Sequence, residues 1–261
     1  MYSPNPTPTP RHPNEHRQQS DPSEYALRAI QALHDASDPC DLLVALFRAN
    51  RAFGVRASAC VHLVPDPEHA PQVLLLLAGD AELAWVHSHR GSWLEHPWLR
   101  HARDHAEAAV ASSLEAPQPA ITERSTGLES LSALDTILII PTHSGGGTGR
   151  FGALIIDTAC EPASAAMPPN SLRLLAHSLA SELHEWWLRR TRAELQSSAR
   201  LRSDDLRLLD YERQGLSTKE IARLVGVSVS ALDSRFQRIN AKLGTSHRRH
   251  AALRAAIHGL L

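Results

Sequence analysis

The residues whose types and spacing best support a chemical role lie in the stretch 215–244, which reads GLSTKEIARLVGVSVSALDSRFQRINAKLG. At about 100° per residue, its second half has a narrow apolar stripe made of Leu232, Phe236, Ile239 and Leu243. The opposite pole consists of Ser230, Ser234, Gln237 and Ala241. One flank is basic and carries Arg235, Arg238 and Lys242. Small polar side chains and Gln suit base edges, and a basic flank suits phosphates, so this stretch predicts a helix that reads duplex DNA.

The elements that must position this helix are also visible in the sequence. Gly226 permits a sharp turn, and Ser228 is a favourable N-cap for the helix that follows. Apolar-periodic segments precede the turn at 203–215 and 218–225, and another follows at 247–261. An isolated helix of this composition could equally present a solvated charged face, but the neighbouring helix, turn and terminators favour the DNA-reading interpretation. We therefore predict an all-α, four-helix, helix-turn-helix domain over 203–261.

The charge distribution separates this segment from the rest of the chain. Residues 201–261 hold eleven Lys/Arg against six Asp/Glu, a net charge of about +5. The remaining sixteen basic and twenty-two acidic residues leave the first 200 residues at about −6. This asymmetry predicts a polyanionic partner for the C-terminal part only.

The N-terminal part mixes helical and strand patterns. Residues 1–22 are rich in Pro, Asn and Gln and are predicted to be disordered. Helices are expected at 24–36, 40–53, 80–90, within 91–119, near 126–134 and at 171–195, and strands at 57–64, 72–78, 135–142 and 151–158. The strands are joined by hairpins, so the fold class is α+β, an α/β/α sandwich around an antiparallel sheet. We place this domain at 23–190 and a polar linker at 191–202.

Several functions are disfavoured by what the sequence lacks. The longest apolar run, VLLLLA at 73–78, is too short for a bilayer, and the first 23 residues lack the apolar core of a signal peptide. We therefore expect a cytoplasmic protein with no membrane partner, in which Cys40, Cys60 and Cys160 are buried and reduced. His101 and His105 have a spacing that metals can use, but nothing completes the site, so no metal or other cofactor is predicted. The chain has neither GxSxG nor GxxxxGK[ST], and we expect no enzyme.

The C-terminal stretch resembles the helix-turn-helix of LuxR/FixJ-type transcription regulators in its G-x-S-x-K-E-I-A, V-S and K-L-G motifs. The resemblance implies that Lys219, Arg235, Arg238 and Lys242 approach DNA, and that the fourth helix pairs two modules on an inverted repeat. Together with the polar pole, the turn and the matching basic residue after it, the predicted DNA-binding set is Lys219, Ser228, Ser230, Ser234, Arg235, Gln237, Arg238, Lys242 and Arg248.

Three positions depart from the family pattern. Ala231 stands where the family usually has Thr, Asp233 stands where it has a basic residue, and RSDD replaces the usual opening of the first helix. Asp233 has three open interpretations: a structural role near the helix N-terminus, a weakening of backbone binding, or a hydrogen bond from cytosine N4.

Residues 25–190 resemble, in layout, the acyl-homoserine-lactone-binding domain of quorum-sensing regulators. The similarity lies in a W…HPW segment and in TILIIPTHSGGGTGRFGALIID before a long helix. It implies a signal-binding and dimerisation domain whose pocket contains Trp85, His89, Trp93, His96 and Trp98. His96 stands where the family has the Asp that accepts the ligand amide, so we expect a signal other than a standard acyl-homoserine lactone. Trp93 and Trp98 could equally be plain core residues.

These features predict a DNA-binding transcription regulator that responds to a small diffusible signal. Its expected partners are double-stranded DNA carrying an inverted repeat, the signal molecule, and a second copy or a related regulator in a dimer. Two alternatives remain open: a ligand-independent orphan regulator whose pocket is filled by side chains, and an antagonist that dimerises with a related regulator and barely binds DNA.

Overall fold

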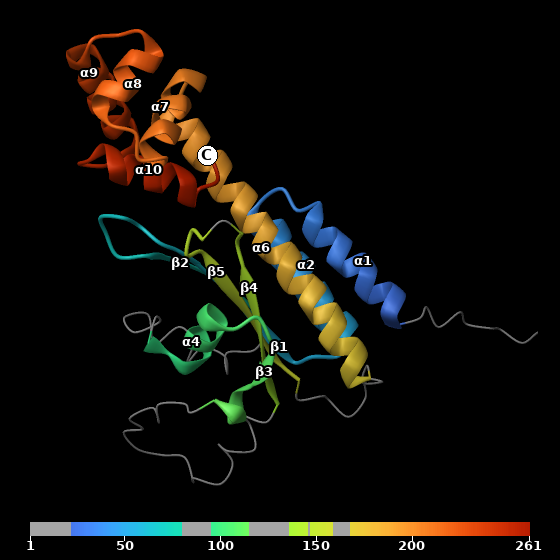
Figure 1. Ribbon diagram of the computed structural model, residues 1–261. Helices are drawn as coiled ribbons and strands as arrows, with labels where there is room; N and C mark the ends of the chain where they lie inside the picture. The colour runs from blue at the N-terminus through green and yellow to red at the C-terminus, as the bar shows by residue number, and fades with distance from the viewer. Residues whose placement is uncertain (1–21, 80–94, 115–135, 146, 159–167) are drawn as a thin grey trace, which may run out of the picture.

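The computed structural model describes residues 22–79, 95–114, 136–145, 147–158 and 168–261 of the 261-residue chain. Its sheet contains β1 (Ala57–Val64), β2 (Gln72–Ala78), β3 (Ala109–Val110), β4 (Ile137–His143) and β5 (Phe151–Asp157). Within the described residues the strand order is β2-β1-β5-β4-β3, and every neighbouring pair is antiparallel. The antiparallel sheet and the hairpin β4–β5 confirm the predicted strand arrangement (Figure 1).

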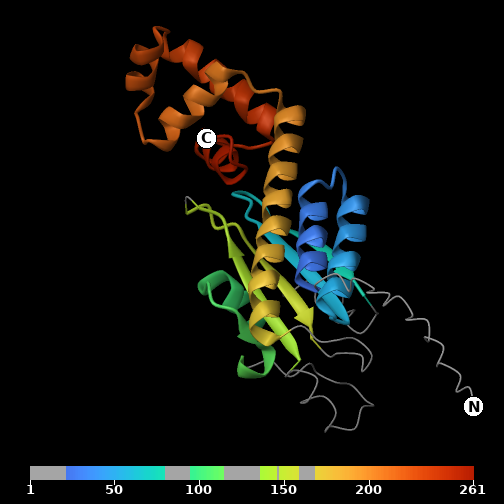
Figure 2. The same cartoon turned by 90° about the vertical axis from the view of Figure 1, so that its right-hand side faces the viewer.

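Helices cover both faces of this sheet. The helices α1 (Pro22–His34), α2 (Pro39–Phe53) and α6 (Pro169–Ala199) pack on one face, and α4 (Pro97–Asp104) packs on the other (Figure 2). The start of α2 shows how local sequence sets these bounds: the Asp38 carboxylate accepts hydrogen bonds from the backbone N–H groups of Cys40 (2.7 Å) and Asp41 (2.9 Å). Gly54, in the left-handed conformation, ends the helix.

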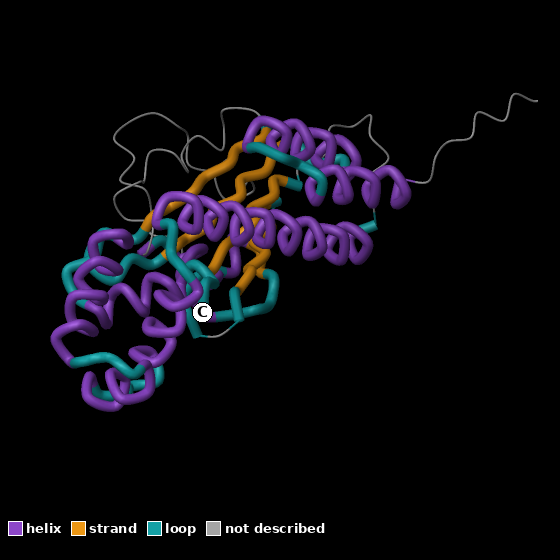
Figure 3. Tube along the Cα trace, turned by 90° about the horizontal axis from the view of Figure 1, so that it is seen from above, coloured by secondary structure: helices purple, strands orange, loops and turns teal. Residues whose placement is uncertain are grey.

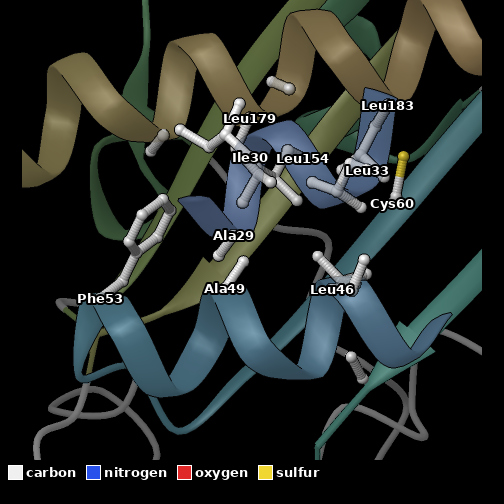
Figure 4. Packing of buried hydrophobic residues seen from close by; sticks show 14 of the residues in the cluster. Ala29, Ile30, Leu33, Leu46, Ala49, Phe53, Cys60, Leu154, Leu179 and Leu183 are labelled. Carbon is white, nitrogen blue, oxygen red and sulfur yellow. The ribbon is translucent and has the colours of Figure 1, made fainter. Parts of the chain in front are cut away.

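The larger apolar core lies between the sheet and α1, α2 and α6. In Figure 4, Leu179 and Leu183 of α6 lie close to Leu33 and Ile30 of α1. The indole N–H of Trp186 donates to the carbonyl of Ala36 at 2.7 Å, which fixes α6 against the turn after α1. This is the face predicted from the leucine periodicity of 171–195.

The two described cysteines differ in environment. Cys60 is buried in this core, and burial raises the pKa of its thiol to about 12, whereas Cys40 at the start of α2 is exposed. Both are free thiols. The prediction of burial was therefore wrong for Cys40, because the amphipathic face of α2 turns its first residues toward solvent. Cys160 lies outside the described residues.

A polar network lies inside this otherwise apolar layer, between β1, β4 and α6. The imidazole nitrogens Nδ1 of His62 and Nδ1 of His184 are 3.2 Å apart, and Nε2 of His184 lies 3.0 Å from the Ser144 hydroxyl. His62 is 1% exposed and His184 is 5% exposed. The ring of His184 packs directly over Gly152 in β5, where a Cβ atom would lie 3.3 Å from its Nδ1.

Gly152→Ala is expected to lower the free energy of unfolding by about 2 kcal/mol, since an added methyl group overpacks this site. The Cβ atom would lie 2.7 Å from the Thr142 hydroxyl and 2.9 Å from the carbonyl oxygen of Val61, which belongs to the central strand and cannot move aside. Chemical denaturation measures the loss. Gly145→Ala is the matched control, because nothing lies within 4 Å of its Cβ position. Equal unfolding midpoints for the two variants would contradict the prediction.

The C-terminal helical region consists of α7 (Ser203–Arg213), α8 (Thr218–Val225), α9 (Val229–Leu243) and α10 (Arg248–Ile257) around its own apolar core. Figure 3 shows these helices gathered at one end of the molecule. The all-helical region after the sheet confirms the predicted fold class.

The segment predicted as a linker is mostly helix. The helix α6 continues through Ala199, and Arg200 then turns the chain in the left-handed conformation (φ 46°). The long helix was predicted to end at residue 195, but Ala199 is buried in the C-terminal core, and this packing extends the helix four residues further.

Candidate functional site

The helices α8 and α9 are positioned by local capping on both sides of their turn. The backbone N–H of Ser217 donates to the Glu220 carboxylate at 2.8 Å, and the Ser217 hydroxyl accepts from the N–H of Glu220, which forms a capping box. Gly226 ends α8 in the left-handed conformation (φ 69°). The Ser228 hydroxyl accepts from the N–H of Ala231 at 3.2 Å and begins α9. These caps fix the angle between the two helices.

The exposed face of α9 is the polar one. The four apolar stripe residues are all buried, and the opposite pole is exposed, including Ser230, Ser234 and Gln237. The Ser234 hydroxyl donates to the carbonyl of Ser230 at 3.0 Å, and the Ser228 hydroxyl caps the helix, so these two side chains also serve the helix itself. The helix thus presents polar side chains on a rigid support, which suits hydrogen bonding in a groove.

The basic residues divide into two groups. Lys219 and Arg238 are exposed, and within the described part of the chain no hydrogen bond or ion pair holds either side chain. Arg235 is half-buried. Lys242 is held internally, with its ammonium 2.8 Å from the carboxylate of Asp205.

Arg248 is the second basic residue that is held internally. Its Nη1 donates to the Thr218 hydroxyl at 2.7 Å, and its Nε lies 3.0 Å from a carboxylate oxygen of Glu212. Its guanidinium also lies 5.6 Å from the ring centroid of Phe236. In this arrangement Arg248 links α7, α8, α9 and α10. Whether Lys242 or Arg248 also contacts DNA stays a prediction.

Asp233 is exposed and lies on the flank of α9 that faces the start of α10. There it borders an open hollow of about 560 Å³, which is also lined by Gln237, Asn240, Ser246 and Arg249, among others. No described residue bonds to its carboxylate. The structure therefore places the acid beside the basic start of α10 and away from the flank that carries Arg238, a neighbourhood that helix periodicity could not indicate.

The second face of the sheet packs against α4, which begins at two of the residues predicted to hold a signal, His96 and Trp98. Its buried cluster is apolar and combines alternate residues of β1, β4 and β5 with α4. His96 caps the start of α4, where its Nδ1 accepts from the N–H of Trp98 (3.3 Å), and its ring meets the Trp98 ring edge-on at 5.1 Å. Trp98 is 2% exposed and belongs to this cluster. Trp85, His89 and Trp93 lie outside the described residues.

Three residues that resemble a catalytic arrangement were not predicted from the sequence. Ser144, His184 and His62 form a hydrogen-bonded chain whose order matches that of a nucleophile, its base and an orienting group. The third member here is an imidazole, which lacks the negative charge that stabilises a protonated base. Burial, with the nearby charges of Arg150 and His143, lowers the pKa of His184 to about 4. An imidazole with so low a pKa is too weak a base for catalysis near neutral pH. We therefore assign a structural role to the hydrogen-bonded residues Ser144, His184 and His62.

Two further features concern metals and membranes. His101 and His105 stack at 4.7 Å, and Nε2 of His101 lies 2.8 Å from the carbonyl of Glu107. The described residues contain no group of three or more His, Cys, Asp or Glu side chains that could hold a metal ion. None of the described helices is both long and apolar enough to cross a membrane.

The fold is similar to solved structures of one protein, SdiA, over nearly the whole chain. Escherichia coli SdiA aligns with a TM-score of 0.65 and 14% identity, covering 92% of this chain and 99% of that one. A structure of SdiA in complex with octanoyl-rac-glycerol aligns with a TM-score of 0.62 and 12% identity, covering 93% and 98% of the two chains. The N-acylhomoserine lactone dependent LuxR family transcription factor CepR2 from Burkholderia cenocepacia aligns at 14% identity with a TM-score of 0.45, over 64% of this chain and 96% of that one. No family model and no curated protein matches the sequence. At these identities the likeness to SdiA establishes a shared fold across both regions.

Proposed function

We propose that this chain is a divergent LuxR-type transcription regulator that binds DNA through α9 and responds to a small, largely apolar signal. The observation that carries the proposal is the capped pair α8–α9. The helix α9 exposes a polar pole and Arg238, α8 exposes Lys219, and no described residue bonds to either basic side chain. The fold shared with SdiA over 92% of the chain supports it. In this reading α9 enters the major groove, where polar side chains meet base edges and basic ones meet phosphates.

The signal would bind against the second face of the sheet. That face is lined by apolar residues of four strands, with His96 and Trp98 at the start of α4. The Nδ1 acceptor of His96 is already bonded to the N–H of Trp98, so His96 cannot take the place of the family's carboxylate. We therefore propose an apolar ligand other than a standard acyl-homoserine lactone. The solved complex of SdiA with octanoyl-rac-glycerol is an example of an acyl compound bound to the same fold.

In this proposal the protein acts in the cytoplasm as a homodimer that binds an inverted repeat. Signal binding changes the relative position of the two α8–α9 pairs, one in each subunit. The chemistry is recognition, with no catalytic step. The coupling between signal and DNA is a free energy shared by two sites, so each ligand would raise or lower the affinity for the other by the same factor.

The antagonist alternative also has an observation in its favour. Lys242 and Arg248, two of the nine predicted DNA-binding residues, are engaged inside the protein, and Asp233 adds an exposed negative charge to α9. These features reduce the positive charge available for phosphates. A chain that dimerises with a related regulator and binds DNA poorly would show the same features.

Binding of the purified full chain to promoter fragments at increasing salt separates the two functions. A direct regulator should lose affinity steeply, because each neutralised phosphate contributes about −0.9 to the slope of log K against log [salt]. Binding that is absent at all salt concentrations, with and without extracts that contain the signal, would refute the regulator and favour the antagonist.

Asp233→Lys is expected to raise the affinity for non-specific duplex DNA about tenfold near 0.1 M salt. The slope of log K against log [salt] should become steeper by an amount that corresponds to about one phosphate contact. The physical reason is that the carboxylate is exposed beside the polar pole of α9 with no partner in the described structure. Fluorescence anisotropy across a salt series measures both quantities. Asp233→Asn is the control that removes the charge without reversing it, and it should give an intermediate result. A slope that all three proteins share would show that position 233 faces away from the DNA backbone.

A further inference from the structure

The loop between β1 and β2 bonds to the start of α10, although the two segments are 178 residues apart in the sequence. A single carboxylate oxygen of Glu68, Oε1, accepts three hydrogen bonds there. The donors are the backbone N–H of Ser246 (2.8 Å), the hydroxyl of Ser246 (2.7 Å) and Nδ1 of His250 (2.7 Å). The contact joins the region that holds the sheet to the region that holds α9.

The loop is shaped to present this carboxylate. Asp66 accepts hydrogen bonds from the backbone N–H groups of Glu68 (2.9 Å) and His69 (3.0 Å), which folds the loop into a tight turn. The second carboxylate oxygen of Asp66 lies 3.8 Å from the guanidinium of Arg254, one turn further along α10 than His250. Two acidic residues of the N-terminal region therefore meet one basic face of α10.

The start of α10 favours a negative charge. Its N-cap residue, His247, makes no side-chain cap hydrogen bond, and the positive end of the helix dipole lies there. The Glu68 carboxylate lies beside this end, bonded to Ser246, which precedes the N-cap, and to the side chain of His250. Hydrogen bonds from the Ser246 hydroxyl and N–H, followed by that of His250, lower the pKa of Glu68 to about 2, so the carboxylate is ionised at any physiological pH.

This end of α10 lies beside the DNA-reading surface. Ser246 and Arg249 at the start of α10 line the same hollow as Gln237 on the exposed face of α9. A duplex whose groove holds α9 would bring its backbone close to Ser246. Converging donors at a helix N-terminus suit a phosphate oxygen as well as a carboxylate oxygen.

We propose that Ser246 and His250 form a binding site for a DNA backbone phosphate, and that Glu68 occupies this site as a phosphate mimic when DNA is absent. Docking of the loop on α10 and full contact with DNA are then mutually exclusive, so Glu68 acts as an autoinhibitory latch. The inference rests on the proposed DNA-binding function. Because β1 and β2 also form part of the apolar face assigned to the signal, a ligand packed there would shift the loop and change the strength of the latch.

The test compares DNA affinity among variants of the full chain at one salt concentration. Glu68→Ala is expected to bind duplex DNA about tenfold more tightly than the control Glu24→Ala, which removes the same charge from the exposed surface of α1. Glu68→Asp keeps the negative charge but is one methylene too short to reach Ser246, and it should also tighten binding. If only Glu68→Ala does so, charge repulsion explains the gain and the latch is wrong.

Amide hydrogen exchange without DNA tests the docking independently. The N–H of Ser246 should exchange faster in Glu68→Ala and Glu68→Asp than in Glu24→Ala, and saturating duplex should slow it again in the two Glu68 variants. Inorganic phosphate at equal ionic strength serves as the comparison, since protection by phosphate but not by duplex would overturn the assignment to DNA. Unchanged exchange would overturn the latch alone, whereas failure of every variant to bind DNA would overturn the proposed function as well.

Discussion

Lowering the pH from 7 to 5 is expected to reduce the free energy of unfolding by about 4 kcal/mol through the buried pair His62 and His184. Burial, the neighbouring His184 and the charge of Arg150 lower the pKa of His62 from 6.5 to about 3. Burial, followed by the charges of Arg150 and His143, lowers the pKa of His184 to about 4. Both imidazoles are thus neutral in the folded protein at pH 5, but in the unfolded chain they are mostly protonated.

The sign of the effect follows from proton uptake. Between about pH 6.5 and 4 the unfolded chain binds more protons than the folded chain, so acid favours unfolding. The stabilisation is complete above the unfolded pKa and is lost as the pH falls toward the folded values. Each imidazole contributes about 1.4 kcal/mol for every pH unit below 6.5.

Urea denaturation at several pH values measures this dependence. The double variant His62→Gln, His184→Gln has no titrating group at either site, so its stability should vary less between pH 7 and 5 than that of the parent protein. His177 and His258, whose pKa values are also lowered, first by burial, remain in both proteins and cancel in the comparison. Parallel stability curves for the parent and the double variant would rule out the buried pair as the source of acid sensitivity.

Reversing the charge of Lys219 and Arg238 together is expected to weaken duplex binding about 100-fold near 0.1 M salt. The slope of log K against log [salt] should become less steep by an amount that corresponds to about two phosphate contacts. These two basic residues of α8 and α9 are exposed and unengaged in the described structure, so they are available for phosphates. The corresponding reversal of Lys242 would also break its ion pair with Asp205, so it could not separate binding from folding.

Lys219→Glu, Arg238→Glu is best compared with Arg48→Glu, Arg51→Glu, which makes the same change of net charge on exposed positions of α2. Circular dichroism confirms that both proteins remain folded. Equal losses of affinity in the two variants would mean that net charge alone governs binding, and that α8 and α9 do not form the interface.

The bounds of the C-terminal helices could be predicted because the signals that set them are local. Ser217, Gly226, Ser228 and Gly244 act on backbone groups within one helical turn, and the structure places a cap or a left-handed turn at each. The strands were predictable for a similar reason, since a buried strand needs a continuous run of apolar residues and a turn on each side. The same reasoning placed the end of the long helix too early, at 195, because packing on the C-terminal core keeps the polar residues 196–199 helical.

The candidate sites were only partly predictable. The polar pole of α9 follows from helix periodicity, but periodicity reports only the direction of a side chain and not what lies beside it. The engagement of Lys242 by Asp205, and of Arg248 by Thr218 and Glu212, depends on which helices pack together. Of the five predicted signal-binding residues, the structure places two, His96 and Trp98, side by side at the start of α4.

By itself, the sequence determined the elements: where helices and strands begin, which face of each is apolar, and which end of the chain is basic. These follow from interactions between residues a few positions apart. Only the tertiary structure decided the contacts between distant segments, namely the histidine pair joined across 122 residues and the bond of Glu68 to Ser246 across 178. The physical reason is that a hydrogen bond acts over about 3 Å, so its formation depends on the packing of the whole chain and leaves no periodic trace in the sequence.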